Sequence, residues 1–423
     1  MQYLSEEEAR ELVRAYMAKE GEPVTAQDIL NAGVFPILNG FVVKPGKVSD
    51  CINGGEGEFI IPADKEPYYL DQLRGLPVEF TAFTDTADDN KPKVRVSFKN
   101  PPLLTRAEKI PGYIMLRSNR LSTHDIGRGR IPFNDQVLAL NHDHMRRLVT
   151  PFFPSSQFEL GLPPGSVVIA SEQVTGMDFE NVLRAFMAKT TTETSLYHAY
   201  MNQKLRKFAG YDLPDDLYPN GPTPSIYDTP STKSASHDVT VEPGYLFKMK
   251  ICTPVAYFRL RNKSLAAFGA VMAYLLERGI ILVDVKTEHG YNYLGVLCSK
   301  DELYTMNSAR YWDLVDYLAQ EKLFLAGDES GLVEYLQRTQ PGITEKDYVV
   351  NSRVIIVPKS FSKEFARDMS KGKEGYSDEQ RAAIAIRYIM GIQHLLQQRF
   401  EPDLRPWHER VETDLREVIS QLF

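Results

Sequence analysis

Residues 264–279, SLAAFGAVMAYLLERG, repeat apolar side chains at helical spacing and lead directly into IILVDV at 280–285. A helix followed at once by an apolar strand has to bury one face of each element in a shared core. The chain has 423 residues, of which 43% are hydrophobic and 25% charged, so it can build a large core divided among two or three subdomains. Periodicity alone therefore predicts a mixed α and β protein without saying how its strands pair.

Further helices are predicted where apolar residues recur every three or four positions. Ser5 with Glu8 and Ser377 with Gln380 also have the spacing of helix capping boxes. The helical segments are Ser5–Glu20, 178–189 (DFENVLRAFMAK), 308–321, 377–400 and the stretch after Pro406.

Strands are predicted where β-branched and apolar residues gather between turn residues. They lie in 35–48, in pieces of 62–109, in 109–118 (KIPGYIMLRS) and in 166–174 (SVVIASEQV), and the polar run at 85–93 is expected to be a hairpin tip. Residues 150–165 read as a connector. Residues 210–237 read as a long loop rich in Pro, Asp, Ser and Thr, which is a candidate substrate-binding segment.

The net charge of −7 is spread along the chain in alternating signs and forms no basic patch, so nucleic acid is not an expected partner. The first residues lack the pattern of a signal peptide, and no stretch has the apolar length of a membrane span. We therefore expect a cytoplasmic protein with no membrane partner. The three cysteines and eight histidines show no metal-binding spacing, so a transition-metal site is not expected.

One strand carries three charged residues on the same face. Asp284, Lys286 and Glu288 alternate along an extended chain beside the buried run IILVDV. A lysine between two acids can neutralise a transferred phosphoryl group while the carboxylates hold Mg²⁺. The alternative is the solvated face of an edge strand.

Five motifs in order make the first interpretation the better one. They are PGKVSD at 45–50, SNRLSTHD at 118–125, TPSTKSASHD at 229–238, VDVKTEHG at 283–290 and DELYTMNSARYW at 301–312. Together they resemble motifs of the SAICAR synthetase family of purine biosynthesis: GKVRD, TDRISAFD, TPSTKxxxHDE, DTKFEFG and DEVLTPDSSRFW. The likeness reaches from about residue 44 to the C-terminal helices.

The resemblance implies an ATP-dependent ligase that phosphorylates the carboxylate of carboxyaminoimidazole ribonucleotide, after which the amine of aspartate displaces phosphate. It implies ATP and Mg²⁺ as cofactors and an imidazole ribonucleotide and aspartate as small-molecule partners. A homo-oligomer is possible. The alternatives are a catalytically silent nucleotide-binding or regulatory homologue, and a diverged ligase that uses another carboxylate or amine.

The resemblance also implies roles for individual residues. The catalytic residues would be Lys286, Asp284 and Asp238. The cofactor would contact Lys47, Glu288 and Asp301, of which Glu288 and Asp301 would also hold the metal. The substrates would contact Ser122, Asp125, Arg184, Thr190, Ser231, Lys233, Arg310 and Arg367.

Several positions depart from the family pattern. Ser49 replaces the arginine of GKVRD, Ser118 and Asn119 replace Thr-Asp before Arg120, and Val239 replaces the glutamate of HDE. The sequence IPFND at 131–135 replaces IPGKG, so the lysine and both glycines of that loop are gone. The residues for phosphoryl transfer thus match better than the loop that shapes the substrate pocket.

The resemblance implies an α+β fold in which an antiparallel-sheet nucleotide-binding lobe precedes a larger α+β lobe, with ATP in the cleft between them. We expect four parts. They are an N-terminal helical extension at 1–40, the nucleotide-binding lobe at 41–165 with an insertion at about 52–110, the central substrate and Mg²⁺/ATP lobe at 166–376, and C-terminal helices at 377–423.

Overall fold

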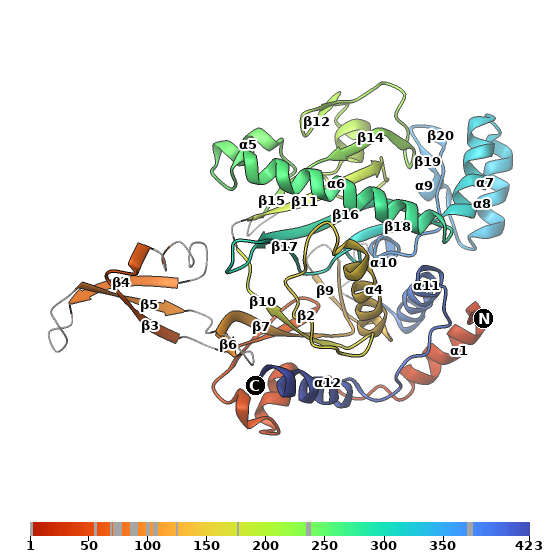
Figure 1. Cartoon of the computed structure of the whole chain (residues 1–423). Coiled ribbons are helices and arrows are strands. Elements are labelled where there is room, and N and C mark those ends of the chain that lie inside the picture. Colours follow the sequence, from red (N-terminus) through yellow and green to blue (C-terminus); the bar gives the residue numbers. More distant parts are fainter. Residues whose placement is uncertain are drawn as a thin grey trace.

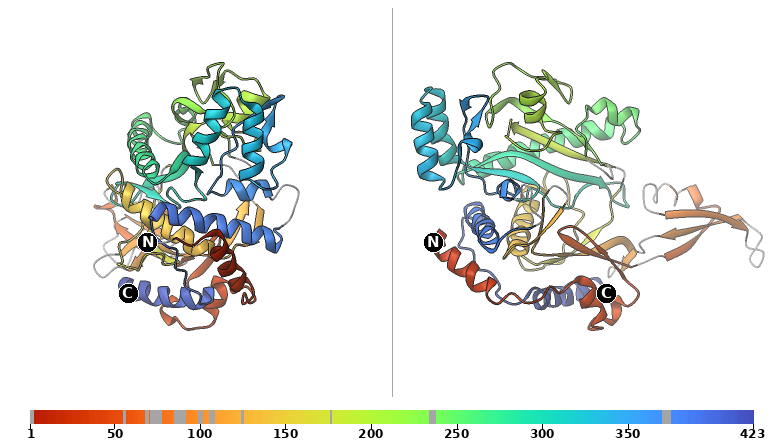
Figure 2. Two further views of the ribbon diagram at one scale, coloured as in Figure 1. Left: turned by 90° about the vertical axis from the view of Figure 1, so that its right-hand side faces the viewer. Right: turned by 180° about the vertical axis from the view of Figure 1, so that it is seen from behind.

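The structure is a computed structural model of the chain. It describes all residues except 1–2, 55–56, 68–69, 71–77, 85–91, 99–101, 105–108, 124–125, 176, 234–237 and 370–374. Figure 1 shows a body built around two sheets, with a smaller sheet projecting from one side. The N-terminal and C-terminal helices both lie along the lower edge of this body, as the further views in Figure 2 show.

The N-terminal sheet is antiparallel, with strand order β1-β2-β7-β10 and β6 paired to β7. Its strands are β1 (Val42–Pro45), β2 (Ser49–Asn53), β6 (Pro102–Leu104), β7 (Lys109–Arg117) and β10 (Val168–Glu172). Alternate side chains, including Ile52 and Ile114, pack against α2 (Ala26–Asn31), the 3-10 helix η1 (Pro36–Leu38) and α12 (Trp407–Leu422). The expected antiparallel sheet near the N-terminus is confirmed.

The projecting sheet lies within the expected insertion. Its order is β3-β5-β4, formed by β3 (Gly57–Pro62), β5 (Pro92–Phe98) and β4 (Val78–Thr84), and it has a small core of its own around Ile61 and Val96. The predicted hairpin tip falls mostly on residues 85–91, outside the described residues.

The central sheet has the order β14-β11-β16-β17, with β15 paired to β11 and β18 paired to β16. The strands are β11 (Phe179–Phe186), β14 (Pro222–Asp228), β15 (Ser231–Thr232), β16 (Ile280–Tyr291), β17 (Leu297–Lys300) and β18 (Ala309–Asp313). Helix α6 (Pro254–Leu276) packs on β16 and runs into it through Gly279, whose φ of 73° suits glycine at a helix end. The predicted helix-to-strand unit is confirmed.

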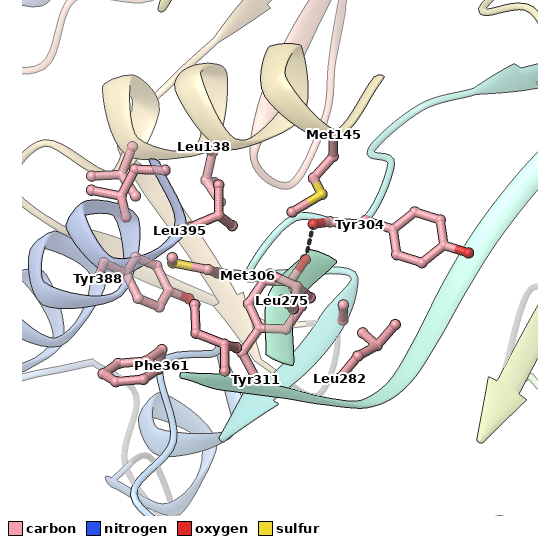
Figure 3. Packing of buried hydrophobic residues seen from close by; sticks show 14 of the residues in the cluster. Leu138, Met145, Leu275, Leu282, Tyr304, Met306, Tyr311, Phe361, Tyr388 and Leu395 are labelled. Atoms are coloured by element: carbon pink, nitrogen blue, oxygen red, sulfur yellow. Dashed lines mark hydrogen bonds between the residues drawn. The ribbon is translucent and has the colours of Figure 1, made fainter. Parts of the chain in front are cut away.

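The largest core joins elements from both ends of the chain. Helix α1 (Glu6–Met17) packs against α11 (Asp378–Leu396), and α11 packs against α4 (Asn134–Val149). Figure 3 shows side chains of α4 and α11 meeting those of the central sheet, with the Tyr311 hydroxyl donating to the carbonyl of Tyr304. Leu4, Ala9 and Val13 belong to this core, so α1 is integrated into the body. The division into four parts stays a prediction.

The remaining elements surround the central sheet. They are the hairpin β8 (Arg120–Thr123) and β9 (Ile126–Arg130), the π-helix η2 (His198–Asn202), β12 (Lys207–Phe208), β13 (Tyr211–Asp212), α5 (Pro243–Lys248), α7 (Leu314–Leu325), α8 (Glu329–Thr339), α9 (Glu345–Tyr348), β19 (Val349–Val350), β20 (Arg353–Val354) and α10 (Glu364–Met369). Among the helices that the structure describes, none combines the length and apolar character that a membrane crossing needs.

The helix predicted at 178–189 is wrong, because this segment forms strand β11. Its apolar residues fit helical spacing, but β11 lies between β14 and β16 and is buried along most of its length. In a strand covered on both faces, apolar residues need not alternate, so periodicity cannot distinguish it from a buried helix. Hydrogen bonding to β14 and β16 makes this segment a strand.

Two other predictions are wrong in part. The expected loop at 210–237 contains the seven-residue strand β14, which starts at Pro222 and lies at the edge of the sheet, where proline is tolerated. The expected helix at 308–321 begins only at Leu314, because residues 309–313 pair with β16 as β18. Asp313 then caps helix α7 by accepting a hydrogen bond from the backbone of Asp316.

The predicted helices at both ends are confirmed. Helix α1 has the Ser5–Glu8 capping box, and α11 has the Ser377–Gln380 capping box. The final helix α12 follows Pro406. Helix α4, for which no helix was predicted, begins within the altered IPFND sequence, where Phe133 has a φ of 61°.

Candidate active site

Strand β16 places Asp284 between two arginines on neighbouring strands. In the sheet register, Asp284 is opposite Arg184 on β11 and opposite Arg310 on β18. Arg184 Nη1 lies 2.8 Å from Asp284 Oδ2, and Arg310 Nε lies 3.1 Å from Asp284 Oδ1. All three side chains are largely buried, so each guanidinium depends on the carboxylate for compensation of its charge.

A third arginine joins this group from outside the sheet. Arg310 Nη1 lies 3.1 Å from Glu364 Oε1 on α10, and Arg367 follows on the same helix. Burial lowers the pKa of Arg367, and the charge of nearby Arg310 lowers it further. Three arginines thus gather near Asp284 and Glu364, a concentration of positive charge that suits an anion such as phosphate.

A second charged group lies further along β16. Lys286 pairs with Glu180 on β11, and Glu288 pairs with Lys233, which follows β15. Burial opposes the charged form of Lys286, but the charges of Glu180, Glu288 and Asp301 outweigh it and raise the pKa of the ammonium group. Burial raises the pKa of Glu180 despite its lysine partner. The alternation of charged residues predicted for this strand is confirmed.

Asp301 lies just after β17, in a left-handed backbone conformation with φ 61°. Part of the residue is exposed, yet surrounding protein desolvates its carboxyl group, and together with the charges of Glu288 and Glu302 this raises its pKa to about 6. Burial raises the pKa of the Cys51 thiol to about 11, and the charge of Asp301 adds to that shift. Asp301 therefore lies close enough to the N-terminal sheet for its charge to affect the Cys51 thiol.

Glu288 and Asp301 are the two carboxylates that could hold a magnesium ion. The charge of Glu288 contributes to the raised pKa of Asp301, and a divalent cation would relieve this repulsion. No group of three or more Asp, Glu, His or Cys side chains is arranged for a metal among the described residues. Mg²⁺ commonly binds one or two carboxylates and completes its shell with water and nucleotide phosphates, so two carboxylates suffice.

The loop expected to bind substrate reaches this second group from one side. Ser231 on β15 pairs with Glu180 on β11, and Lys233 extends to Glu288. The charge of Asp238 contributes to the raised pKa of Glu180, so Asp238 lies near the same carboxylate. Residues 234–237 between them are outside the described residues.

Three predicted residues lie in other parts of the structure, and a fourth cannot be placed. Lys47 is in the turn between β1 and β2 and lines a cavity, Ser122 is buried in the β8–β9 hairpin, and Thr190 follows β11 with its hydroxyl bonded to that of Thr192. Asp125 lies outside the described residues. The roles assigned to all of these residues stay predictions.

The turn before Lys47 requires glycine. A Cβ at Gly46 would lie 2.2 Å from the carbonyl oxygen of Ser49, and the Gly46 amide donates to Asp50 Oδ1 at 3.2 Å. Any side chain at this position would force the hairpin apart. The Gly-Lys pair therefore fixes a tight turn at the tip of the N-terminal sheet.

Two acidic residues of the site were missed by the sequence analysis. Glu180 pairs with Lys286, and Glu364 pairs with Arg310. Had 178–189 been interpreted as a strand, Glu180 and Arg184 would have been expected on one face, because side chains alternate. For Glu364 no comparable signal is present, since it reaches Arg310 through the packing of α10.

Comparisons with known proteins identify relatives of this chain. The family model described as SAICAR synthetase matches residues 133–325. A chloroplastic phosphoribosylaminoimidazole-succinocarboxamide synthase from Arabidopsis thaliana is 28% identical over 323 residues, which are 73% of this chain and 69% of that protein. The synthase of that name from Bacteroides thetaiotaomicron is 24% identical over 73% of this chain and 90% of its own length.

The fold comparison agrees as well. The SAICAR synthase from Saccharomyces cerevisiae, solved in complex with SAICAR, superposes with a TM-score of 0.56 over 90% of this chain and 99% of that one. At 14% identity this likeness shows the shared α+β fold. The family match contains β11, β16 and β18, the three strands that carry Arg184, Asp284, Lys286, Glu288 and Arg310. These comparisons support a member of the SAICAR synthetase family, with the family match confined to residues 133–325.

Proposed function

We propose that this chain is a phosphoribosylaminoimidazole-succinocarboxamide synthase, an ATP-dependent ligase that joins the carboxylate of carboxyaminoimidazole ribonucleotide to the amine of aspartate. The observation that carries the proposal is the order of charges along β16. Asp284 holds two arginines, and Lys286 and Glu288 follow on the same face of the strand. A site for an anionic nucleotide thus adjoins a site for phosphoryl transfer.

The arginine group would bind the ribose phosphate of the imidazole nucleotide. Arg184 and Arg310 are held in place by Asp284, so their guanidinium groups are oriented before the substrate arrives. Such pre-organisation reduces the entropy lost on binding. Thr190 would add a hydroxyl donor to the same phosphate.

Lys286 would neutralise the charge that moves in the first step. A carboxylate oxygen of the imidazole nucleotide attacks the γ-phosphorus of ATP, the bond from that phosphorus to the β,γ-bridging oxygen breaks, and the products are an acyl phosphate and ADP. The ammonium group of Lys286, whose pKa is raised by neighbouring acids, stays protonated at neutral pH. Electrostatic stabilisation of this kind dominates phosphoryl-transfer catalysis.

Ser231, Lys233 and Asp238 would hold the aspartate substrate and orient its amine. The neutral amine attacks the acyl carbon, a C–N bond forms, phosphate leaves with the former carboxylate oxygen, and the nitrogen loses a proton. Ser231 and Lys233 are fixed by the pairing of β15 with β11 and by Glu288. Asp238 near Glu180 is the candidate to orient the attacking amine.

Glu288 and Asp301 would hold Mg²⁺ together with the nucleotide phosphates. A bound Mg²⁺ supplies positive charge to the β- and γ-phosphate oxygens. Lys47 and the Gly46 turn would approach those phosphates from the N-terminal sheet. The prediction of ATP in the space between the two lobes is supported by Asp301, whose charge affects the Cys51 thiol of that sheet.

The test is a reconstituted reaction followed by mass spectrometry. The purified chain is incubated with ATP, Mg²⁺ and carboxyaminoimidazole ribonucleotide, with and without aspartate, and each substrate is omitted in turn. Product that requires all three substrates would support the proposal. ADP release without dependence on aspartate would indicate another amine. Nucleotide binding without ADP release in any mixture would indicate a silent homologue.

A matched pair of variants isolates the role of Lys286. Lys286→Met removes the charge, and turnover should fall by about 100-fold or more, the usual loss when a transition-state donor is removed. Lys263→Met makes the same change on the exposed face of α6 and should leave turnover unchanged. Equal activity of both variants would contradict the role of Lys286.

The cellular location and assembly stay predictions of a cytoplasmic protein and a possible homo-oligomer. The name of the Arabidopsis relative assigns that protein to the chloroplast, so relatives occur in more than one compartment. Cell fractionation and light scattering of the purified chain would test the two predictions.

A further inference from the structure

A cavity of about 660 Å³ has Lys47 in its wall but not Lys286, Glu288 or Asp301. Its walls come from the C-terminal end of α1, from residues 19–25, from the β8–β9 hairpin and from residues 404–408 at the start of α12. Pockets that bind small organic ligands measure roughly 300–1,000 Å³. The cavity is therefore large enough for a ligand of nucleotide size.

The cavity lies at the face of the N-terminal sheet that packs against α12. Side chains alternate along β2, and Ile52 packs with α12 on one face while Cys51 is affected by the charge of Asp301 on the other. Asp50 shares the face of Ile52 and lines the cavity beside Trp407. A ligand here would therefore contact the face of β2 that carries Asp50 and Ile52.

Two aromatic side chains give the cavity rigid apolar walls. Tyr16 packs on Phe133 with ring centroids 4.4 Å apart, and Trp407 donates from Nε1 to the carbonyl oxygen of Arg117 at 2.7 Å. Leu12 and Val24 add aliphatic surface. Fixed aromatic surfaces of this kind favour a planar ring system.

The charges in the walls favour an anion. The cavity is lined by four basic residues, Lys19, Lys47, Arg120 and Arg130. It is also lined by three acidic residues, Glu20, Glu22 and Asp50.

Two of the three acids already have cationic partners. Arg120 Nη2 lies 2.7 Å from Asp50 Oδ1, and Glu20 is paired with Arg130 and Arg381. The Nε of Arg120 is buried and has no hydrogen-bond partner among the described residues. The Arg120 side chain as a whole is 33% exposed, so its guanidinium group can still meet a ligand oxygen.

We propose that this cavity binds a planar anionic small molecule of nucleotide size, with its ring against Tyr16 and Trp407 and its acidic group near Arg120. The inference rests on the cavity alone and holds whether or not the chain is a ligase. Because the cavity contacts the turn that carries Lys47, its ligand would also contact the tip of the N-terminal sheet.

Calorimetric titration with inosine 5′-monophosphate tests the proposal, with inosine and ribose 5-phosphate as probes that lack the phosphate and the base. The complete probe should bind at least 10-fold more tightly than either fragment. Ala15→Phe and Val24→Phe, which fill the cavity from two walls, should each weaken binding at least 10-fold. Ala18→Phe, an exposed position at the end of the same helix that does not line the cavity, should not.

Tryptophan fluorescence tests independently whether the probe binds in this cavity. The chain has two tryptophans, Trp312 in the core and Trp407 in the cavity wall, so Trp312→Phe leaves Trp407 as the reporter. Its fluorescence should change on binding, and binding should survive Lys286→Met in the other cleft. No binding of the complete probe, equal binding of inosine, full binding by both cavity-filling variants, or loss of binding in Lys286→Met would each overturn the proposal.

Discussion

Asp284 accepts a hydrogen bond from Arg184 across two neighbouring strands, with 2.8 Å between Oδ2 and Nη1. The same carboxylate contacts Arg310 from the opposite side through its other oxygen. A single buried acid thus holds two cations that would otherwise repel each other. This arrangement links the stability of the central sheet to the geometry of the proposed phosphate site.

Asp284→Asn should lower both stability and activity. It leaves two buried guanidinium groups without their shared carboxylate, and breaking a buried ion pair costs about 3 kcal/mol or more of unfolding free energy. Urea denaturation measures this loss. Asp215→Asn, which removes an exposed carboxylate paired with Arg206, serves as the control and should leave stability unchanged. Equal stability of the two variants would show that Asp284 does not compensate the arginines.

Lys233→Met should strengthen Mg²⁺ binding in the presence of a non-hydrolysable ATP analogue. The ammonium group of Lys233 pairs with Glu288, where it competes with a metal for the carboxylate. Without it, Glu288 still has Lys300 at 3.9 Å as a cationic neighbour, so we expect Mg²⁺ affinity to rise a few-fold. Calorimetry compares this variant with Lys207→Met, whose partner Asp212 is exposed. Weaker Mg²⁺ binding in Lys233→Met would instead place this lysine among the groups that hold the nucleotide.

Mg²⁺ binding should weaken as the pH falls below about 6. Desolvation and the charges of Glu288 and Glu302 raise the pKa of Asp301 from 3.8 to about 6, and a protonated carboxyl group is a poor metal ligand. In the metal-free protein the raised pKa also means that the folded state binds this proton more tightly than the unfolded state. The contribution of Asp301 to stability therefore decreases as the pH rises from about 4 to about 6.

Mg²⁺ titrations between pH 5 and 8 measure this effect. The affinity of the native chain should fall by up to tenfold per pH unit below the pKa. Asp301→Asn has no titrating group at this position, so its weaker binding should show a flatter pH profile. Parallel profiles for the two proteins would assign the pH dependence to another carboxylate.

The charged residues of β16 could be predicted from the sequence because their spacing is local. Asp284, Lys286 and Glu288 alternate within one strand, and strand geometry places alternate residues on one face. Their partners could not be predicted in the same way. Glu180 reaches Lys286 only because β11 pairs with β16, and that pairing contradicts the helical spacing of its apolar residues.

At the two ends of the chain, the sequence predicts where the helices begin but not how they pack. Capping boxes identify where α1 and α11 begin, since a cap depends on residues three positions apart. They do not reveal that α1 packs against α11, or that the backbone amide of Leu4 donates to Gln393 at 2.8 Å. Contacts between residues so far apart in the sequence follow from the packing of the whole core.

The altered IPFND sequence has a structural partner in the C-terminal helix. Asp135 Oδ2 lies 2.7 Å from Arg410 Nη1 on α12, and both side chains are almost completely buried. Burial opposes the charge of Arg410, but Asp135 outweighs it and raises the pKa of the guanidinium group. Asp135 therefore anchors α12 beside α4, in a position where the family pattern has a glycine of a substrate loop.

A double-mutant cycle should measure this anchor. Asp135→Asn and Arg410→Met should each lower the unfolding free energy by about 3 kcal/mol, because each leaves its partner charged and buried. The double variant should lose clearly less than the sum, since it removes both charges. Arg405→Met, in which an exposed partner of Asp403 is replaced, is the control and should be close to neutral. Additive losses would show that the two residues act separately. The presence of Asp135 in the altered IPFND sequence would then not be explained by attachment of α12.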